Sequence, residues 1–290
     1  REETQKTLFL KKRIIEQEIT SFTFASRKEP EFMRHQLVQC NECDLVYANK
    51  PPSQSLLHES YHEADYDSQD EANDAADAYL KAMRQAFSRL NSKDRALDIG
   101  TGDGIFLEYL VKEGFKNPEG IEPSHQAIES APLDRQLIIK NGIFNEKDYE
   151  QGSFDLITCF MTMEHVLDPF YVASSAIKLL KPGGAFITVT HNYRSLVNRI
   201  LGSKSPIIDI EHMQLFSNES ILELMKVTGF VNVSNKSFKN KYQILYWIKL
   251  LPLPSAIKHL MRRILVLCKL NKLKLSINVG NQITCAFKKL

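Results

Sequence analysis

Residues 96–104 read ALDIGTGDG, a short apolar run that ends in three closely spaced glycines. The segment that follows, FLEYLVKEGF at 106–115, has helical spacing. A glycine turn between a predicted strand and a predicted helix brings backbone N–H groups and the positive end of the helix dipole close to an anion. The third glycine of a dinucleotide fingerprint would fall at Ile105. The turn therefore predicts a site for a phosphate or a carboxylate without completing that fingerprint.

Strand and helix patterns alternate on the carboxyl side of this turn. Strands are predicted at 96–100, 119–123, 136–140, 154–160 and 185–191, and helices at 106–115, 125–131, 169–180 and 217–229. This alternation predicts a parallel sheet flanked by helices. Two later segments, 230–235 and 281–287, are expected to close the sheet as an antiparallel pair.

Glu122 adds a second element to the predicted ligand site. It ends the strand that follows the glycine turn, 18 residues after Gly104. A carboxylate in this position can accept hydrogen bonds from both hydroxyls of a ribose. The predicted ligand therefore contains a ribose and a small anionic group.

Five motifs in order resemble those of the class I S-adenosylmethionine-dependent methyltransferases. They are ALDIGTGDG, GIEPS, GSFDLITCF, EHVLDP and LLKPGGAFITV, and the resemblance covers roughly 94–235. It implies an α/β fold with a Rossmann-like, doubly wound sheet of about seven strands, the last pair antiparallel, and helices on both faces. A small N-terminal segment and a helical C-terminal insertion would be added to this core.

The same resemblance implies S-adenosylmethionine as the methyl donor and assigns its site. The implied contacts are Asp98, Gly100, Thr101 and Gly102 around the methionine part, Glu122 on the ribose, Pro123, Phe144 and Asn145 beside the adenine, and Phe160 on the methionine side. Many family members carry an acidic residue near the adenine, whereas this chain reads Asn-Gly-Ile-Phe-Asn at 141–145. The contact to the adenine amino group is therefore left open.

Histidines are the expected catalytic residues. Methyl transfer from a sulfonium is a direct displacement, so placement of the acceptor dominates, and a hydroxyl acceptor gains further from a general base. His165, in MTMEHVLDP, and His212, in the long 192–216 connection, are predicted as bases. The alternative for each is a structural histidine, held by backbone groups or pinning the connection. His191, at the end of the fifth strand, is a third candidate.

Cys40 and Cys43 have the spacing of two zinc ligands. The surrounding LVQCNECDLVYANKPPS resembles half of a zinc ribbon that precedes the core in a bacterial methyltransferase subfamily, often linked to surface polysaccharide or other glycan biosynthesis. A structural zinc is expected here only if a second ligand pair lies upstream, and the alternative is two free thiols. The chain does not begin with Met, and whether it is truncated at its N-terminus is left open.

The predicted organisation has three parts. Residues 1–60 form the remnant zinc-ribbon-like segment and 61–93 a linker helix region. The methyltransferase domain spans 94–290, with acceptor-side insertions at 192–216 and 240–278.

Charge is distributed unevenly between the two ends of the chain. The net charge of +2 combines +13 on residues 224–290, which contain no Asp or Glu, with −11 on residues 1–223. The basic, apolar insertion at 240–278 is expected to cover an anionic acceptor or to contact an anionic membrane, and the alternative is an ordinary solvated face. No aromatic-interleaved basic motif accompanies this charge, so nucleic acid is not expected as a partner.

The sequence thus predicts a cytoplasmic methyltransferase, with peripheral contact to the inner face of the membrane as an option. Its expected acceptor is a hydroxyl of a sugar or glycan intermediate in surface polysaccharide synthesis. Two alternatives stay open: an O-methyltransferase of a quinone-like or other lipophilic small molecule, and a non-catalytic scaffold that binds S-adenosylmethionine. Fold class alone does not choose among them.

Overall fold

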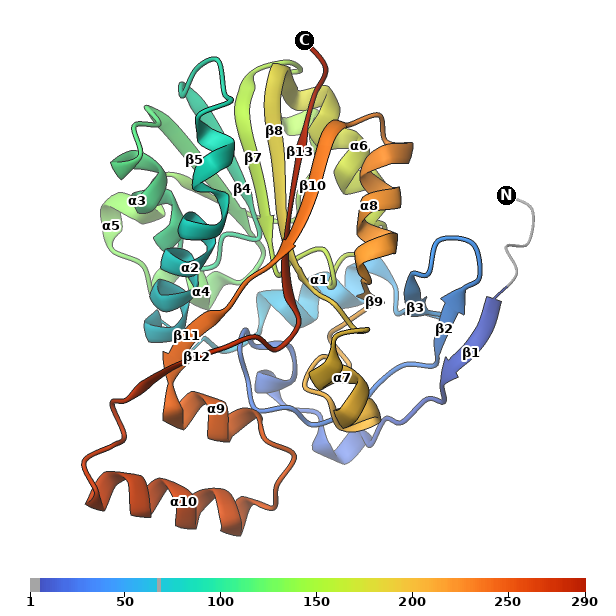
Figure 1. Cartoon of the computed structure of the whole chain (residues 1–290), viewed down its shortest axis with the longest axis vertical. Helices are drawn as coiled ribbons and strands as arrows, with labels where there is room; N and C mark the ends of the chain where they lie inside the picture. The colour runs from blue at the N-terminus through green and yellow to red at the C-terminus, as the bar shows by residue number, and fades with distance from the viewer. Residues whose placement is uncertain (1–5, 67–68) are drawn as a thin grey trace.

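A seven-stranded sheet forms the centre of the computed structural model, which describes residues 6–66 and 69–290 (Figure 1). Its order is β10-β13-β8-β7-β4-β5-β6. The strands are β4 (Arg95–Ile99), β5 (Asn117–Glu122), β6 (Ile139–Asn141), β7 (Phe154–Phe160), β8 (Leu180–His191), β10 (Val231–Ser237) and β13 (Asn281–Phe287). Strands β4 to β8 pair in parallel, and β13 runs antiparallel to both β8 and β10. The predicted Rossmann-like α/β fold is confirmed.

Helices cover both faces of the sheet because its central strands are apolar on both sides. One core cluster joins the sheet to α2 (Gln69–Phe87) and α3 (Ile105–Lys112), and the other joins it to α6 (Pro169–Leu179) and α8 (Asn218–Val227). All seven residues of β7 are buried, as expected for the middle of a parallel sheet. Two short helices, α4 (His125–Glu129) and α5 (Leu133–Gln136), connect β5 to β6.

Sequence patterns located most of these elements. The predictions for 154–160 and 281–287 coincide with β7 and β13. The strand expected at 136–140 begins only at Ile139, because Leu133–Gln136 forms α5 instead. The apolar run at 137–139 begins before the strand does, and a run this short does not show whether it belongs to a helix or to a strand.

The N-terminal segment forms a second, four-stranded sheet of order β1-β2-β3-β9. Its strands are β1 (Lys6–Leu10), β2 (Leu37–Cys40), β3 (Val46–Ala48) and β9 (Gln214–Leu215), with two 3-10 turns, η1 (Glu16–Glu18) and η2 (Ser21–Phe24), between β1 and β2. Strand β9 belongs to the 192–216 insertion, so this sheet fastens the N-terminal segment to the acceptor side of the domain. The boundary expected at residue 60 falls inside α1 (Gln54–His62).

The C-terminal insertion is helical, as predicted, but a small sheet holds its ends together. Strands β11 (Asn240–Gln243) and β12 (Lys274–Ile277) pair antiparallel, and α9 (Ile244–Leu250) and α10 (Ser255–Leu267) lie between them in sequence. Figure 1 shows α10 at the lower edge of the molecule, beyond α9 and away from the central sheet. The insertion at 192–216 contains α7 (Leu196–Leu201) and the 3-10 turn η4 (Gly202–Lys204), and η3 (Glu146–Asp148) precedes β7.

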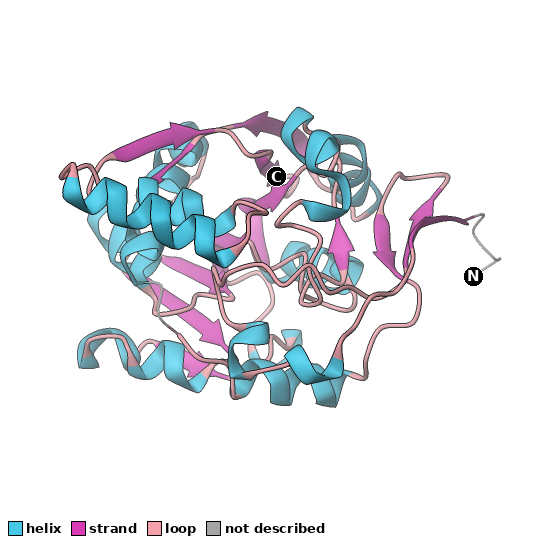
Figure 2. Cartoon of the chain, turned by 90° about the horizontal axis from the view of Figure 1, so that it is seen from below, coloured by secondary structure: helices cyan, strands magenta, loops and turns pink. Residues whose placement is uncertain are grey.

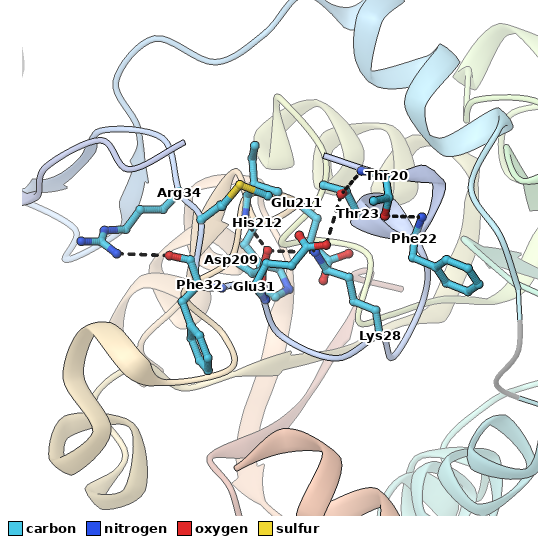
Figure 3. Close-up of polar contacts among 12 residues, drawn as sticks. Thr20, Phe22, Thr23, Lys28, Glu31, Phe32, Arg34, Asp209, Glu211 and His212 are labelled. Carbon is cyan, nitrogen blue, oxygen red and sulfur yellow. Dashed lines mark hydrogen bonds and ion pairs between the residues drawn. The ribbon is translucent and has the colours of Figure 1, made fainter. Parts of the chain in front are cut away.

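A buried ion pair fixes the N-terminal segment against the 192–216 insertion (Figure 3). Lys28 Nζ lies 2.9 Å from Asp209 Oδ1, and the two side chains are 4% and 1% exposed. Asp209 Oδ2 accepts hydrogen bonds from the backbone N–H groups of Glu31 and Phe32. Burial alone would lower the pKa of Lys28, but Glu211, Asp209 and Glu31 raise it, so the lysine stays charged.

Replacing Asp209 by alanine removes the buried partner of Lys28 and leaves it paired only with the less buried Glu31. We therefore expect Asp209→Ala to lower the free energy of unfolding by about 3–5 kcal/mol, measured by urea denaturation. Asp77→Ala is the matched control, because it removes the exposed Asp77–Lys81 pair and should change stability by less than about 1 kcal/mol. Equal effects of the two variants would contradict the structural role of Asp209.

Candidate active site

A cavity of about 1000 Å³ opens at the edge of the sheet where the parallel strands end. Figure 2 shows this face from below, with loops crowded in its middle between the long helix α10 on one side and the N-terminal sheet on the other. Each residue predicted to bind the donor lines this cavity, and so do both predicted bases. The edge is the position at which doubly wound sheets bind their ligands.

The glycine turn shapes the donor end of the cavity. Gly100 has φ +74°, and a Cβ at this position would come within 2.2 Å of Thr162 Oγ1, so the turn admits no larger residue. Gly102 has φ +60° and nothing within 4 Å of its Cβ position. Its backbone N–H instead donates to Glu122 Oε2 at 2.8 Å.

Glu122 links this turn to the end of β5. Its second oxygen, Oε1, accepts the N–H of Ser124 at 2.9 Å, and the side chain is only 9% exposed. Burial raises its pKa to about 7, against the opposing effect of the two backbone hydrogen bonds. A carboxylate has about four acceptor sites, so two remain for the hydroxyls of a ribose. This chemistry fits the ribose of S-adenosylmethionine.

Side-chain hydrogen bonds of Asp98 stabilise the glycine turn. Thr101 Oγ1 donates to Asp98 Oδ2 at 2.8 Å, and Thr158 Oγ1 donates to Asp98 Oδ1 at 2.6 Å. Burial raises the pKa of Asp98 to about 6. Asp98 therefore helps to fix the conformation of the turn, and it also lines the cavity.

Aromatic side chains border the turn on two sides. Phe144, predicted beside the adenine, is buried against the rings of Tyr149 and Tyr171. Phe160, predicted on the methionine side, lies between Tyr79 and Phe106, with ring centroids 4.9 and 4.8 Å away. Asn145 is exposed at the rim and Pro123 also lines the cavity.

Three histidines from separate segments meet in the same cavity. His165 follows β7, His191 ends β8 and His212 precedes β9. The ring centroids of His165 and His212 are 4.7 Å apart, and those of His191 and His212 are 6.4 Å apart. The structure therefore brings both predicted bases together with the third candidate.

Hydrogen bonds assign the tautomers of His165 and His212. Nδ1 of His165 lies 3.2 Å from the carbonyl oxygen of Glu211, and Nδ1 of His212 lies 2.9 Å from that of Ile207. Because a carbonyl oxygen only accepts, we assign the hydrogen to Nδ1 in both rings, which leaves Nε2 able to take a proton. Tyr61 also contacts His165 Nδ1 at 3.0 Å.

The two rings differ in burial. Burial lowers the pKa of His165, whose side chain remains 21% exposed. Burial and the neighbouring histidines lower the pKa of His212 much further, and this residue is 9% exposed. Its bond to Ile207 pins the 192–216 insertion, so the geometry favours the structural interpretation of His212.

Glu164 is a buried carboxylate that sequence patterns do not single out. Its Oε1 lies 2.7 Å from the backbone N and 3.2 Å from Nδ1 of His191. Its Oε2 is buried and has no hydrogen-bond partner among the described residues. Glu164 therefore orients the His191 ring. It directly precedes His165 in EHVLDP, which is the one sequence signal that could have indicated it.

An aromatic wall lines another part of the same cavity. It consists of Tyr79 from α2, Tyr242 from β11, and Tyr246 and Trp247 from α9. Arg27 also lines the cavity, and its guanidinium opposes the rise in pKa that burial causes in Tyr79 and Tyr242. Patterns near the donor motifs cannot predict this wall, because its members are distant in sequence.

The cysteine pair lies outside this cavity. Cys40 ends β2 and is buried, while Cys43 is half-buried in the turn before β3, and both are free thiols. Over the described ranges 6–66 and 69–290, no group of three or more His, Cys, Asp or Glu side chains could hold a metal ion. The zinc site that depends on an upstream ligand pair stays a prediction.

Known proteins resemble this chain in sequence and in fold. A family model described as "Methyltransferase domain" matches residues 69–235. The ubiquinone biosynthesis O-methyltransferase of Neisseria meningitidis is 34% identical over 119 residues, which are 38% of this chain and 50% of that protein. The enzyme of the same name from Burkholderia vietnamiensis is 36% identical over 121 residues, with the same shares. The chain thus spans about half the length of these curated relatives.

Solved structures share the fold at lower identity. A SAM-dependent methyltransferase from Archaeoglobus fulgidus superposes with a TM-score of 0.50 at 18% identity, covering 81% of this chain and all of the other. One from Thermotoga maritima has a TM-score of 0.50 at 20% identity, covering 76% of this chain and 91% of the other. Both likenesses concern the fold.

The raised pKa of Glu122 predicts a pH-dependent donor affinity. The ionised carboxylate accepts from both ribose hydroxyls, whereas the protonated acid loses part of this capacity. Since the pKa is about 7, affinity for S-adenosylhomocysteine should be highest above pH 8 and fall several-fold between pH 7 and pH 6. Isothermal titration calorimetry from pH 6 to 8.5 measures this dependence.

Glu122→Gln provides the control for this prediction. It keeps the size of the side chain but removes its charge, so binding should be weaker, by about 1.5–3 kcal/mol, and nearly independent of pH over the same range. An unchanged pH dependence in the variant would show that another group controls donor binding.

Proposed function

Because this chain belongs to the class I S-adenosylmethionine-dependent methyltransferase family, we propose that it methylates a hydroxyl of a lipophilic, aromatic acceptor. The observation that carries the proposal is that the predicted donor-binding residues, the cluster of three histidines and the aromatic wall line one cavity. A flat apolar acceptor held by this wall would present its hydroxyl to the imidazoles. S-adenosylmethionine, when bound, supplies the electrophilic methyl group.

The acceptor class rests on two kinds of support. The wall of Tyr79, Tyr242, Tyr246 and Trp247 offers apolar faces with hydroxyls at their edges, which suits a phenol or catechol. The relatives matched above are named ubiquinone biosynthesis O-methyltransferases. Both favour the quinone-like alternative over the sugar hydroxyl that the sequence analysis expected, and the glycan acceptor stays a prediction for comparison.

His165 is the proposed general base. Its loop begins directly after Phe160, and Thr162 in this loop lies against Gly100 of the donor turn. His165 is thus the histidine tied most directly to the donor end. With Nδ1–H donated to Glu211, its Nε2 takes the proton from the acceptor hydroxyl as the oxygen attacks. The lowered pKa keeps the ring neutral, and therefore able to accept this proton, at neutral pH.

Neighbouring groups surround His165 and hold its ring in place. Burial raises the pKa of the Glu211 carboxyl, and the neighbouring Lys28 opposes this rise. The Tyr61 hydroxyl lies 3.0 Å from Nδ1 and keeps the ring in place. His191, backed by Glu164, is the second imidazole within reach of the same space.

Replacing His165 tests the assignment of the base. We expect His165→Asn to lower kcat by about 10²–10⁴-fold, while the Kd for S-adenosylhomocysteine changes by less than about threefold. His125→Asn is the matched control, because His125 is exposed on α4 and does not line the cavity. Full turnover in both His165→Asn and His191→Asn would remove the base hypothesis.

Methyl transfer to candidate acceptors tests the substrate class. Purified protein is incubated with radiolabelled S-adenosylmethionine and either an alkyl-substituted catechol or a sugar nucleotide. Transfer to the catechol that is lost in His165→Asn supports the proposal. Transfer to the sugar nucleotide alone would establish the glycan interpretation, and tight S-adenosylhomocysteine binding without transfer to either would favour the scaffold alternative.

A further inference from the structure

The apolar face of α10 points away from the protein. Four side chains at helical spacing, Ile257, Leu260, Ile264 and Leu267, are 45%, 59%, 50% and 81% exposed. Positions three, four and three residues apart lie on the same side of a helix, so they form a continuous stripe. Further exposed apolar residues surround this stripe at Leu251, Leu253, Val266, Leu270 and Leu273. We call this set of nine residues the α10 surface.

The opposite side of α10 faces the protein and carries charge. Lys258 is 5% exposed, with Nζ 2.6 Å from Glu29 Oε1 and 2.8 Å from the carbonyl oxygen of Lys249. Met261, Arg262 and Leu265 are half-buried on the same side. The orientation of the helix is therefore fixed by polar contacts, and the usual inward placement of the apolar face is reversed.

Basic side chains flank the α10 surface without acidic neighbours in the sequence. Arg263, Lys269 and Lys272 are exposed beside the stripe. The final 67 residues contain 13 Lys and Arg and no Asp or Glu. A partner that covers this surface therefore needs an apolar region for the exposed leucines and isoleucines. Next to that region it needs negative charge for the basic side chains.

The α10 surface lies close to the entrance of the cavity. Leu250 of α9 lines the cavity, and Leu251 follows it directly on the α10 surface. Figures 1 and 2 both show α10 at the outer edge of the molecule, with its length across the lower face. A flat partner could therefore contact α10 while the cavity entrance remains beside it.

We propose that the α10 surface docks on an anionic lipid bilayer. An amphipathic helix with an apolar stripe and flanking cations binds at the boundary between headgroups and acyl chains. Each nearby Lys or Arg adds attraction to anionic headgroups. Pairing with a second copy is disfavoured, because it would bring two strongly positive surfaces together. No helix among the described residues is both long and apolar enough to cross a bilayer, so this contact is peripheral.

Vesicle co-sedimentation tests this proposal independently of methyl transfer. The purified chain is mixed with vesicles of phosphatidylcholine alone, or of phosphatidylcholine with 30% phosphatidylglycerol. We expect binding to the anionic vesicles, weakened at least tenfold by Leu260→Gln with Ile264→Gln, and weakened also by 0.5 M salt. Gln keeps the helix propensity, and circular dichroism confirms that the variant folds.

Two further variants separate the contributions of apolar contact and charge. Leu133→Gln with Leu137→Gln is the matched control, because these leucines are 78% and 87% exposed and lie outside the α10 surface, so binding should not change. Arg263→Glu with Lys272→Glu should abolish the preference for anionic lipid. Equal binding to both vesicle types, no binding, or a dimer in solution that the Leu260/Ile264 variant dissociates would each overturn the proposal.

Discussion

The carboxylate of Glu122 is the point at which the two halves of the donor site are joined. It accepts one hydrogen bond from the glycine turn after β4, through Gly102, and one from the loop after β5, through Ser124. Parallel pairing of β4 and β5 brings these loops together, and the carboxylate fixes their distance. Since the side chain is buried, this arrangement costs desolvation, which appears as the raised pKa. The donor geometry therefore depends on this carboxylate, together with the backbone hydrogen bonds that Gly100 and Thr101 donate to Ile121.

The two ends of the cavity are built differently. The donor end consists of strand ends and tight turns within the central sheet, so its geometry follows from the fold. The acceptor end is assembled from the loop after β7, the 192–216 insertion that follows β8, the N-terminal segment and α9. Each of these can change in sequence without disturbing the sheet, which is how one fold serves many acceptors.

The sequence reveals the donor end and most of the sheet because these features are local. The glycines follow a strand and Glu122 and Phe160 each end one, and the apolar runs of these strands are short and well bounded. His165, His191 and His212 could be named as candidates, but their meeting depends on the packing of three separate segments. Arg27 and Tyr242 are separated by more than two hundred residues, and no periodicity relates them. The pair β11 and β12 is missed for the same reason, since α9 and α10 separate its strands.

The buried pair of Lys28 and Asp209 has a consequence for the order in which the chain becomes structured. The two residues are 181 positions apart, so at about 5–20 residues per second roughly 10–40 s of synthesis separate them. During that interval Lys28 has no buried partner, and β3 lacks its neighbour β9. A charged lysine without its partner stays in water. The segment that contains Lys28 is thus made early but reaches its native position late, after the strands of the donor site up to β8 have been made.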